Sequence, residues 1–241
     1  MSTGQPLGLT TCGSKCIRVF AMQVPQLHHA RYVIWDWNGT LLDDVSLVVE
    51  IMDGLLREFG LCGLDVDRYR DTFEFPVEKY YRKLGFDEGH PSFQILATRF
   101  MQEYDRRVLE CPLHVDVREV LNSLLDRGII NIILTSGKRE SVQTLIRHHG
   151  LDHVFCEVIG HEDHFAGSKD YLGRAWLQQR RVNEQVLIFV GDTVHDFDVA
   201  KAMQVQCVLV SHGYNSERDL LRCGCPVVPS LRDFFLRANI T

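Results

Sequence analysis

An aspartate and an asparagine stand directly after a short apolar segment near the start of the chain. The run Tyr32-Val33-Ile34-Trp35 ends on Asp36, and Asn38-Gly39 follows it as the mark of a turn. A buried strand that stops at an aspartate presents that side chain at the carboxyl edge of a sheet, where open α/β folds bind their ligands. The pattern therefore makes Asp36 a candidate functional residue, although an aspartate before Asn-Gly is by itself typical of a simple turn.

Three further polar groups follow apolar segments later in the chain. They are Thr135-Ser136-Gly137, Lys169, and the pair Asp192 and Asp196. In a doubly wound sheet the carboxyl ends of the strands converge on one crevice. A carboxylate nucleophile, a hydroxyl donor, a cation and an acidic pair would then surround one point. Those are the components that phosphoryl transfer needs for positioning, charge neutralisation and a metal ion.

The elements that must position these groups alternate between helix and strand from residue 115 onward. Apolar periodicity predicts strands at residues 129–134, 154–159, 186–190 and 207–210, and helices at residues 117–127, 140–149, 171–181 and 197–203. Gly128 and Gly150 stand where two of these helices should end. Such alternation predicts an α/β fold, a doubly wound parallel sheet with helices on both faces.

The segment between the first strand and residue 112 has a different character. It contains helical patterns at residues 48–59, 77–84 and 93–109 and no convincing buried strand. Asp43 and Asp44 are expected to cap its first helix, and the break at residues 73–76 separates two of the others. We call residues 45–112 the helical insertion.

The stretch Asp36-Trp37-Asn38-Gly39-Thr40-Leu41 resembles the nucleophile motif Asp-x-Asp-Gly-Thr-Leu of the haloacid dehalogenase superfamily. The order of the other polar groups and the size of the helical insertion fit the same superfamily. The overall pattern looks most like its phosphoglycolate-phosphatase-like branch, in which a small helical cap is inserted between the first two motifs. The resemblance covers roughly residues 31–240.

This resemblance implies a role for each residue. Asp36 would attack phosphorus and form an aspartyl-phosphate. Asp36, Asp192 and the backbone carbonyl of Asn38 would hold Mg²⁺, with Asp196 in support. Thr135, with Ser136 and Gly137, would bind the phosphate, and Lys169 would neutralise charge on it. The family usually has Lys-Pro where this chain has Lys169-Asp170, so Lys138 is a rival for that role.

Asn38 departs from the motif, because the family's second aspartate protonates the leaving oxygen and later activates water. An amide cannot carry out this acid–base step, which is typically worth about 10²–10⁴-fold in rate. The chain could be a phosphatase that borrows His195 or Asp43, or that acts on a substrate needing little help. It could instead catalyse a phosphonate- or halide-cleaving reaction of the family, or be a catalytically weak phosphate-binding or regulatory protein. The retained acidic residues favour the phosphatase.

Two other groups of residues are candidates for binding. His161-Glu162-Asp163-His164 places two histidines three apart, but a solvated loop is the favoured interpretation. Arg68, Arg70 or Lys79 of the helical insertion could meet an anionic tail of the substrate, near the break at residues 73–76.

Composition bounds the remaining possibilities. The 26 Lys and Arg against 32 Asp and Glu give a net charge of −6, so no basic surface is expected for nucleic acid. No apolar run approaches the ~20 residues that span a bilayer. We expect a cytoplasmic protein, monomer or homodimer, that acts on a small phosphorylated metabolite and not on a membrane.

The predicted organisation has three parts. Residues 1–30 form a flexible N-terminal extension, residues 31–44 and 113–241 form the core domain, and residues 45–112 form the helical cap.

Overall fold

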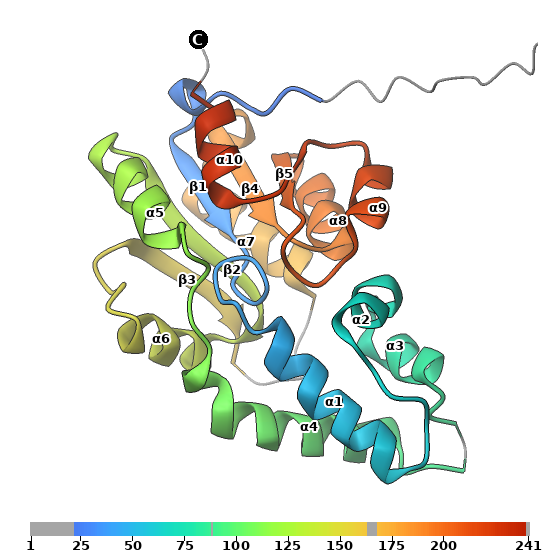
Figure 1. Ribbon diagram of the computed structural model, residues 1–241. Coiled ribbons are helices and arrows are strands. Elements are labelled where there is room, and N and C mark those ends of the chain that lie inside the picture. Colours follow the sequence, from blue (N-terminus) through green and yellow to red (C-terminus); the bar gives the residue numbers. More distant parts are fainter. Residues whose placement is uncertain (1–21, 88, 163–167, 240–241) are drawn as a thin grey trace, which may run out of the picture.

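The computed structural model describes residues 22–87, 89–162 and 168–239, which contain a six-stranded sheet with helices on both faces (Figure 1). Its strand order is β3-β2-β1-β4-β5-β6, and all neighbours are parallel. The strands are β1 (Tyr32–Trp35), β2 (Ile130–Lys138), β3 (Phe155–His161), β4 (Leu187–Gly191), β5 (Gln206–Val210) and β6 (Val227–Val228). The order reverses between β1 and β4, where such sheets bind ligands. The predicted doubly wound α/β fold is confirmed.

Both faces of the sheet are buried, as the continuous apolar strands require. In β1, Val33 and Trp35 belong to one core cluster and Ile34 to the other. Helices α5 (Val117–Asp126), α6 (Arg139–His148) and α10 (Leu231–Arg237) contribute to the first cluster. Helices α7 (Lys169–Arg180), α8 (Val194–Met203) and α9 (Glu217–Leu220) contribute to the second. Single 3-10 turns occur at η1 (Leu27–His29), η3 (Glu184–Val186) and η4 (Leu221–Cys223).

The helical insertion lies between β1 and β2 in the sequence and groups its helices below the sheet in the view of Figure 1. Its elements are α1 (Val45–Glu58), α2 (Val66–Thr72), α3 (Val77–Leu84), α4 (Phe93–Arg107) and η2 (Val108–Glu110). The guanidinium of Arg70 in α2 donates to the carbonyls of Gly213 (2.9 Å) and His212 (2.6 Å), in the loop after β5. The Asn215 side-chain amide donates to the Phe73 carbonyl at 2.9 Å. The insertion is therefore docked on the same loop at two points.

Two helix starts and one helix cap differ from the sequence predictions. Helix α8 begins at Val194 and not at residue 197, because Thr193 and Asp196 form a capping box around its first turn. Helix α7 begins at Lys169, which the sequence placed in a loop. Helix α1 begins at Val45, with Asp44 as the N-cap residue, but the Asp44 side chain makes no capping hydrogen bond. Its carboxylate is used elsewhere.

Part of the predicted N-terminal extension is packed on the core. Within residues 22–30, Val24 and Leu27 are buried, and the Leu27 N–H donates to the Ala238 carbonyl at 2.9 Å. The expectation of a free extension is wrong for this part, because two apolar side chains find a place beside α10. Residues 1–21 lie outside the described residues.

In the part of the chain that the structure describes, no helix is both long and apolar enough to cross a membrane.

A tight turn after β1 carries the site. The Asp36 N–H donates to the Val190 carbonyl at 2.9 Å, which fixes the end of β1 against β4. Gly39 then adopts φ +76°, a conformation that favours glycine. A Cβ at this position would meet Asp192 Oδ2 at 2.4 Å and Tyr214 Cδ1 at 2.8 Å. Only glycine therefore lets the turn approach the end of β4.

We expect Gly39→Ala to lower the free energy of unfolding by about 2–4 kcal/mol, from backbone strain plus displacement of Asp192 and Tyr214. Urea unfolding of the two proteins measures the difference. Gly128→Ala is the matched control, since Gly128 has φ +73° and nothing within 4 Å of the added Cβ. It should lose only about 1 kcal/mol. Equal losses in the two variants would contradict the close approach at Gly39.

Candidate active site

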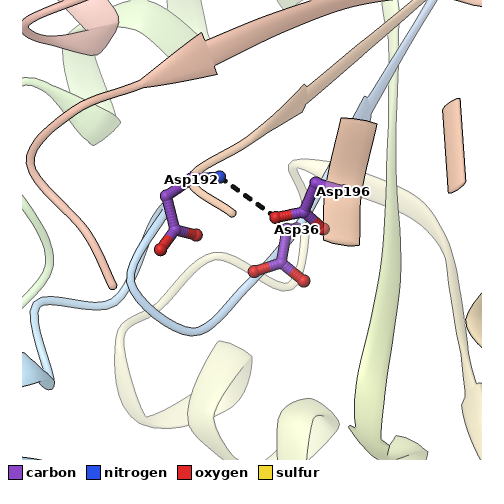
Figure 2. Close-up of side chains that lie close together, drawn as sticks. All are labelled: Asp36, Asp192 and Asp196. Atoms are coloured by element: carbon purple, nitrogen blue, oxygen red, sulfur yellow. Dashed lines mark hydrogen bonds between the residues drawn. The ribbon is translucent and has the colours of Figure 1, made fainter. Parts of the chain in front are cut away.

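Three buried carboxylates converge at the carboxyl ends of β1 and β4 (Figure 2). Asp36 follows β1, Asp192 follows β4, and Asp196 lies in the first turn of α8. Ligand atoms from all three lie within 4.8 Å of one another. Their side chains thus meet at one point, as their positions at strand ends predict.

Lys169 joins this cluster from the first residue of α7. Its Nζ lies 2.5 Å from Asp36 Oδ1 and 2.6 Å from Asp196 Oδ1, and the side chain is 2% exposed. Lys138, the rival in the sequence, pairs instead with Glu140 at 3.1 Å. The structure therefore places Lys169 against the candidate nucleophile, and Lys138 away from it.

Asp196 stabilises the start of α8 and also pairs with the ammonium group of Lys169. Its Oδ2 accepts hydrogen bonds from the N–H groups of Asp192 (3.1 Å) and Thr193 (3.0 Å) and from the Thr193 hydroxyl (2.7 Å). Its Oδ1 faces Lys169. One oxygen of Asp196 thus stabilises the start of α8, and the other pairs with Lys169.

The pKa values in the cluster follow from burial and from an excess of negative charge. Burial raises the pKa of Asp36 to about 7, and Lys169 only partly opposes this effect. Burial and the charge of Asp36 raise the pKa of Asp192 well above its usual range. Burial also opposes ionisation of Asp196, but the Lys169 ammonium outweighs it and lowers the pKa. The cluster thus holds three buried carboxylates and one ammonium, which pairs with Asp36 and Asp196.

A hard divalent cation fits this arrangement. Carboxylate oxygens are the ligands that Mg²⁺ takes in proteins, and a cation would neutralise the surplus negative charge. Thr40 Oγ1 and the Tyr214 N–H orient the two oxygens of Asp192, at 2.5 and 2.7 Å. Both oxygens of Asp196 are already engaged, one at the start of α8 and the other by Lys169. Asp36 and Asp192 are therefore the better metal ligands. Asp196 would act mainly by holding Lys169.

Asn38 is bound to a second buried carboxylate. Its Nδ2 donates to Asp44 Oδ2 at 2.8 Å and lies 2.6 Å from the Tyr104 hydroxyl. The same carboxylate accepts from the hydroxyls of Tyr104 (2.5 Å) and Tyr214 (2.8 Å) and from the Gly39 N–H (3.0 Å). Asp44 therefore serves this network and not the end of α1, which corrects its predicted role as a cap.

Thr135, Ser136 and Gly137 line the cavity described below, but they lie within β2 and not beyond its end. Thr135 is buried, and its Oγ1 accepts from the Gly137 N–H at 2.9 Å. The Thr135 hydroxyl proton can therefore be donated to a ligand. The Gly137 N–H is directed to Thr135 in this conformation.

A cavity of about 580 Å³ extends from the carboxylate cluster into the helical insertion. It is lined by Asp36, Asn38, Lys169 and Asp196 on one side and by α1 to α4 on the other. Its volume is in the range of small-molecule sites. The break at residues 73–76 contributes Phe73 and Phe75 to the wall.

The predicted contacts to an anionic tail are not in this cavity. Arg70 binds the loop after β5, and Arg68 Nη1 donates to the carbonyls of Cys62 and Gly63. Lys79 is exposed. None of the three is among the described residues that line the cavity. The guanidinium groups are used to bind backbone carbonyls, which the sequence pattern does not reveal.

The two acid–base candidates separate clearly. His195 lines the cavity, and its ring centroid lies 4.4 Å from that of Phe75, with the two rings tilted by 30°. Burial lowers the pKa of His195. Asp43 is exposed and lies 4.0 Å from His114.

Of the His161–His164 segment, His161 is buried at the end of β3, and His164 lies outside the described residues.

Sequence reasoning missed several residues around the Asn38 turn. Thr40, Tyr104 and Tyr214 hold the carboxylates of Asp192 and Asp44. His114 and His212 stack at 3.8 Å and bind the Gly39 and Thr40 carbonyls, both at 3.1 Å. Burial lowers the pKa of His212 to about 4. Thr40 belongs to the motif itself, but its contact with Asp192 could not be read from it. The other four residues come from distant segments, and no spacing pattern connects them to the motif.

Comparison with known proteins gives one family. The model described as haloacid dehalogenase-like hydrolase matches residues 33–210. A phosphoglycolate phosphatase of Synechococcus elongatus is 25% identical over 202 residues, which is 80% of this chain and 89% of that protein. A 5'-nucleotidase of Pseudomonas aeruginosa is 25% identical over 194 residues, covering 78% and 86%. A solved "predicted phosphatase" from Clostridium acetobutylicum has a TM-score of 0.73 at 20% identity, covering 86% and 97%.

The contact between Asn38 and Asp44 predicts how Asn38→Asp will behave. The new carboxylate would face Asp44, so one of the two would keep a proton and have a raised pKa in the folded state. An acid with a raised folded pKa loses stability as pH rises above its unfolded value. We therefore expect the variant to lose stability relative to wild type between pH 5 and 8, on the order of 1 kcal/mol per pH unit.

Urea unfolding at several pH values measures this slope. The double variant Asn38→Asp, Asp44→Asn exchanges the two groups and restores one amide beside one carboxylate, so its slope should return toward that of wild type. A single variant with the wild-type slope would show that the two side chains are not in contact.

Proposed function

This chain belongs to the haloacid dehalogenase-like hydrolase family, and we propose on that basis that it is a Mg²⁺-dependent phosphatase that hydrolyses a small phosphate monoester through an aspartyl-phosphate on Asp36. The carrying observation is the position of Asp36, buried at the end of β1 with its Oδ1 on Lys169 and beside Asp192 and Asp196. Relatives described as phosphoglycolate phosphatases and as a 5'-nucleotidase support the hydrolysis of phosphoric monoesters.

The first step would join Asp36 to the phosphoryl group. The Asp36 oxygen that Lys169 does not hold attacks phosphorus, and the bond to the leaving oxygen breaks. Lys169 neutralises charge on the nucleophile and on the phosphoryl oxygens. The Thr135 hydroxyl donates to one of those oxygens.

Asp36 and Asp192, with the Asn38 backbone carbonyl, would hold the Mg²⁺. When bound, the ion supplies charge neutralisation for the phosphoryl oxygens. The Asn38 side chain plays no part in this role, so an amide at this position is compatible with metal binding.

The second step would return Asp36 to its free form. Water attacks the phosphorus of the aspartyl-phosphate, and the bond from phosphorus to the Asp36 oxygen breaks. Asn38 cannot take the proton of that water, whereas the imidazole of His195 lines the same cavity. We assign the acceptor role to His195 and not to the exposed Asp43.

The division into a core domain (31–44 and 113–241) and a cap (45–112) is part of this proposal. The cavity lies between the carboxylate cluster and the helical insertion, so opening of a cap would admit substrate and closure would exclude water. A cytoplasmic location and a monomeric or homodimeric state are kept as predictions.

We expect Asp36→Asn to abolish phosphate release, by a factor on the order of 10³ or more, because an amide is not a nucleophile toward phosphorus. Released phosphate is measured over a panel of monoesters with Mg²⁺. Chelation should abolish the wild-type activity, and added Mg²⁺ should restore it. Asp43→Asn is the matched control, since this exposed carboxylate lies seven residues along the same segment, and it should retain activity.

The alternative function is that of a catalytically weak phosphate-binding or regulatory protein, which Asn38 favours. Activity that appears only in the double variant Asn38→Asp, Asp44→Asn would support that alternative. Wild-type activity that survives Asp36→Asn would contradict the aspartyl-phosphate.

A further inference from the structure

The wall of the cavity opposite the carboxylate cluster is aromatic and apolar. Nine Phe and Tyr side chains line it among the described residues, together with Val48, Met52, Val77, Ala97 and Met101. They come from the four helices of the insertion, from the break at residues 73–76 and, for Tyr214, from the loop after β5. Such a wall favours a flat apolar group, because aromatic rings gain from ring contacts beyond their burial of surface.

The same wall offers no counter-charge to an anionic leaving group. Among the described lining residues, Lys169 is the one with an ammonium or guanidinium group, and it is held by Asp36 and Asp196. The charged group on the insertion side is Asp105, which would repel an anion.

The chemistry at residue 38 restricts the leaving group in a second way. The Asn38 amide has no acidic proton to give, and its Nδ2 is engaged with Asp44 and Tyr104. An alkoxide leaving group is about as basic as hydroxide and needs a proton as it departs. A phenol has a pKa of about 10, so a phenolate can depart without one.

Resting on the phosphatase function above, we propose that the preferred substrates are phosphate esters of uncharged phenols, with the aryl ring seated against the aromatic wall of the insertion. The Asp36 oxygen forms its bond to phosphorus as the bond from phosphorus to the phenolic oxygen breaks. The phenolate leaves with that electron pair and takes a proton from water after release. Water then hydrolyses the aspartyl-phosphate and gives phosphate.

A substrate series separates ring recognition from leaving-group basicity. Phenyl, benzyl and cyclohexyl phosphate are similar in size, but only the first releases a phenol. Wild type should hydrolyse phenyl phosphate with a kcat/KM about 10²–10⁴-fold higher than that of the other two, because kcat/KM includes the step in which the leaving group departs. In the double variant Asn38→Asp, Asp44→Asn this ratio should shrink. Equal kcat/KM values for phenyl and benzyl phosphate in wild type would overturn the leaving-group part of the proposal.

The charge of the leaving group is tested with two esters that both release a phenol. Relative to 4-methylphenyl phosphate, 4-carboxyphenyl phosphate should have a KM at least about tenfold higher, because its carboxylate faces a wall without a cation. Phosphoglycolate should be a poorer substrate than phenyl phosphate in kcat/KM. The reverse order for phosphoglycolate would sink the proposal while leaving the phosphatase function intact.

Binding without turnover distinguishes the proposal from the function on which it rests. Calorimetry with Mg²⁺ should show phenylphosphonate binding at least about tenfold more tightly than phosphonoacetate. Tight phenylphosphonate binding without hydrolysis of any ester would refute the phosphatase and leave the aryl site standing. Equal affinities would refute the aryl site.

Phe100→Leu tests the wall itself, since Phe100 of α4 lines the cavity. We expect it to weaken phenylphosphonate binding several-fold. Ile95→Leu is the control, because Ile95 is 54% exposed on the same helix and is not among the lining residues. Equal effects of the two changes would contradict a site on this wall.

Discussion

The site depends on one buried ammonium. Lys169 lies between Asp36 and Asp196 with 2% of its side chain exposed. Water hardly reaches its ammonium group, so the two carboxylates must stabilise the positive charge. Removing one partner from a buried ion pair typically destabilises a protein by about 3–5 kcal/mol. The positions of β1, α7 and α8 are thereby coupled, because each must bring its charge to the same point. Asp196 can serve this purpose only because the first turn of α8 fixes its other oxygen.

This coupling explains how far the sequence alone could go. Asp36, Asp192 and Thr135 were predicted to converge because parallel strands share a carboxyl edge, and that rule needs no knowledge of packing. The start of α8 was missed, because an aspartate that caps a helix and one that binds a lysine look the same in a sequence. Tyr104 and Tyr214 were missed because they lie 60 and 170 residues away from Asp44 in the sequence. Nothing in the sequence around a tyrosine indicates which group its hydroxyl will bind.

The contact with Asp44 changes how the asparagine at residue 38 is interpreted. As a departure from the family motif, Asn38 suggests a decayed site. In the structure it is one of four donors to a buried carboxylate. A buried carboxylate is stable only when hydrogen bonds satisfy it. Asn38 and Asp44 therefore form a unit, and an aspartate at residue 38 would replace a donor with a second acceptor. The amide is consistent with a working site of altered chemistry.

The two unusual features of the cavity then support the same conclusion. An amide in place of the acid restricts the reaction to leaving groups that depart unaided, and the aromatic wall favours flat, uncharged ones. Basic residues on this wall would reverse the preference, but Arg68 and Arg70 of α2 are bound to backbone carbonyls instead. Arg70 in particular holds the insertion on the loop after β5, so its charge contributes to closure of the cavity and is withheld from the substrate. Such a wall disfavours substrates with an anionic leaving group, because an anion that enters the cavity loses its hydration and finds no positive charge to replace it.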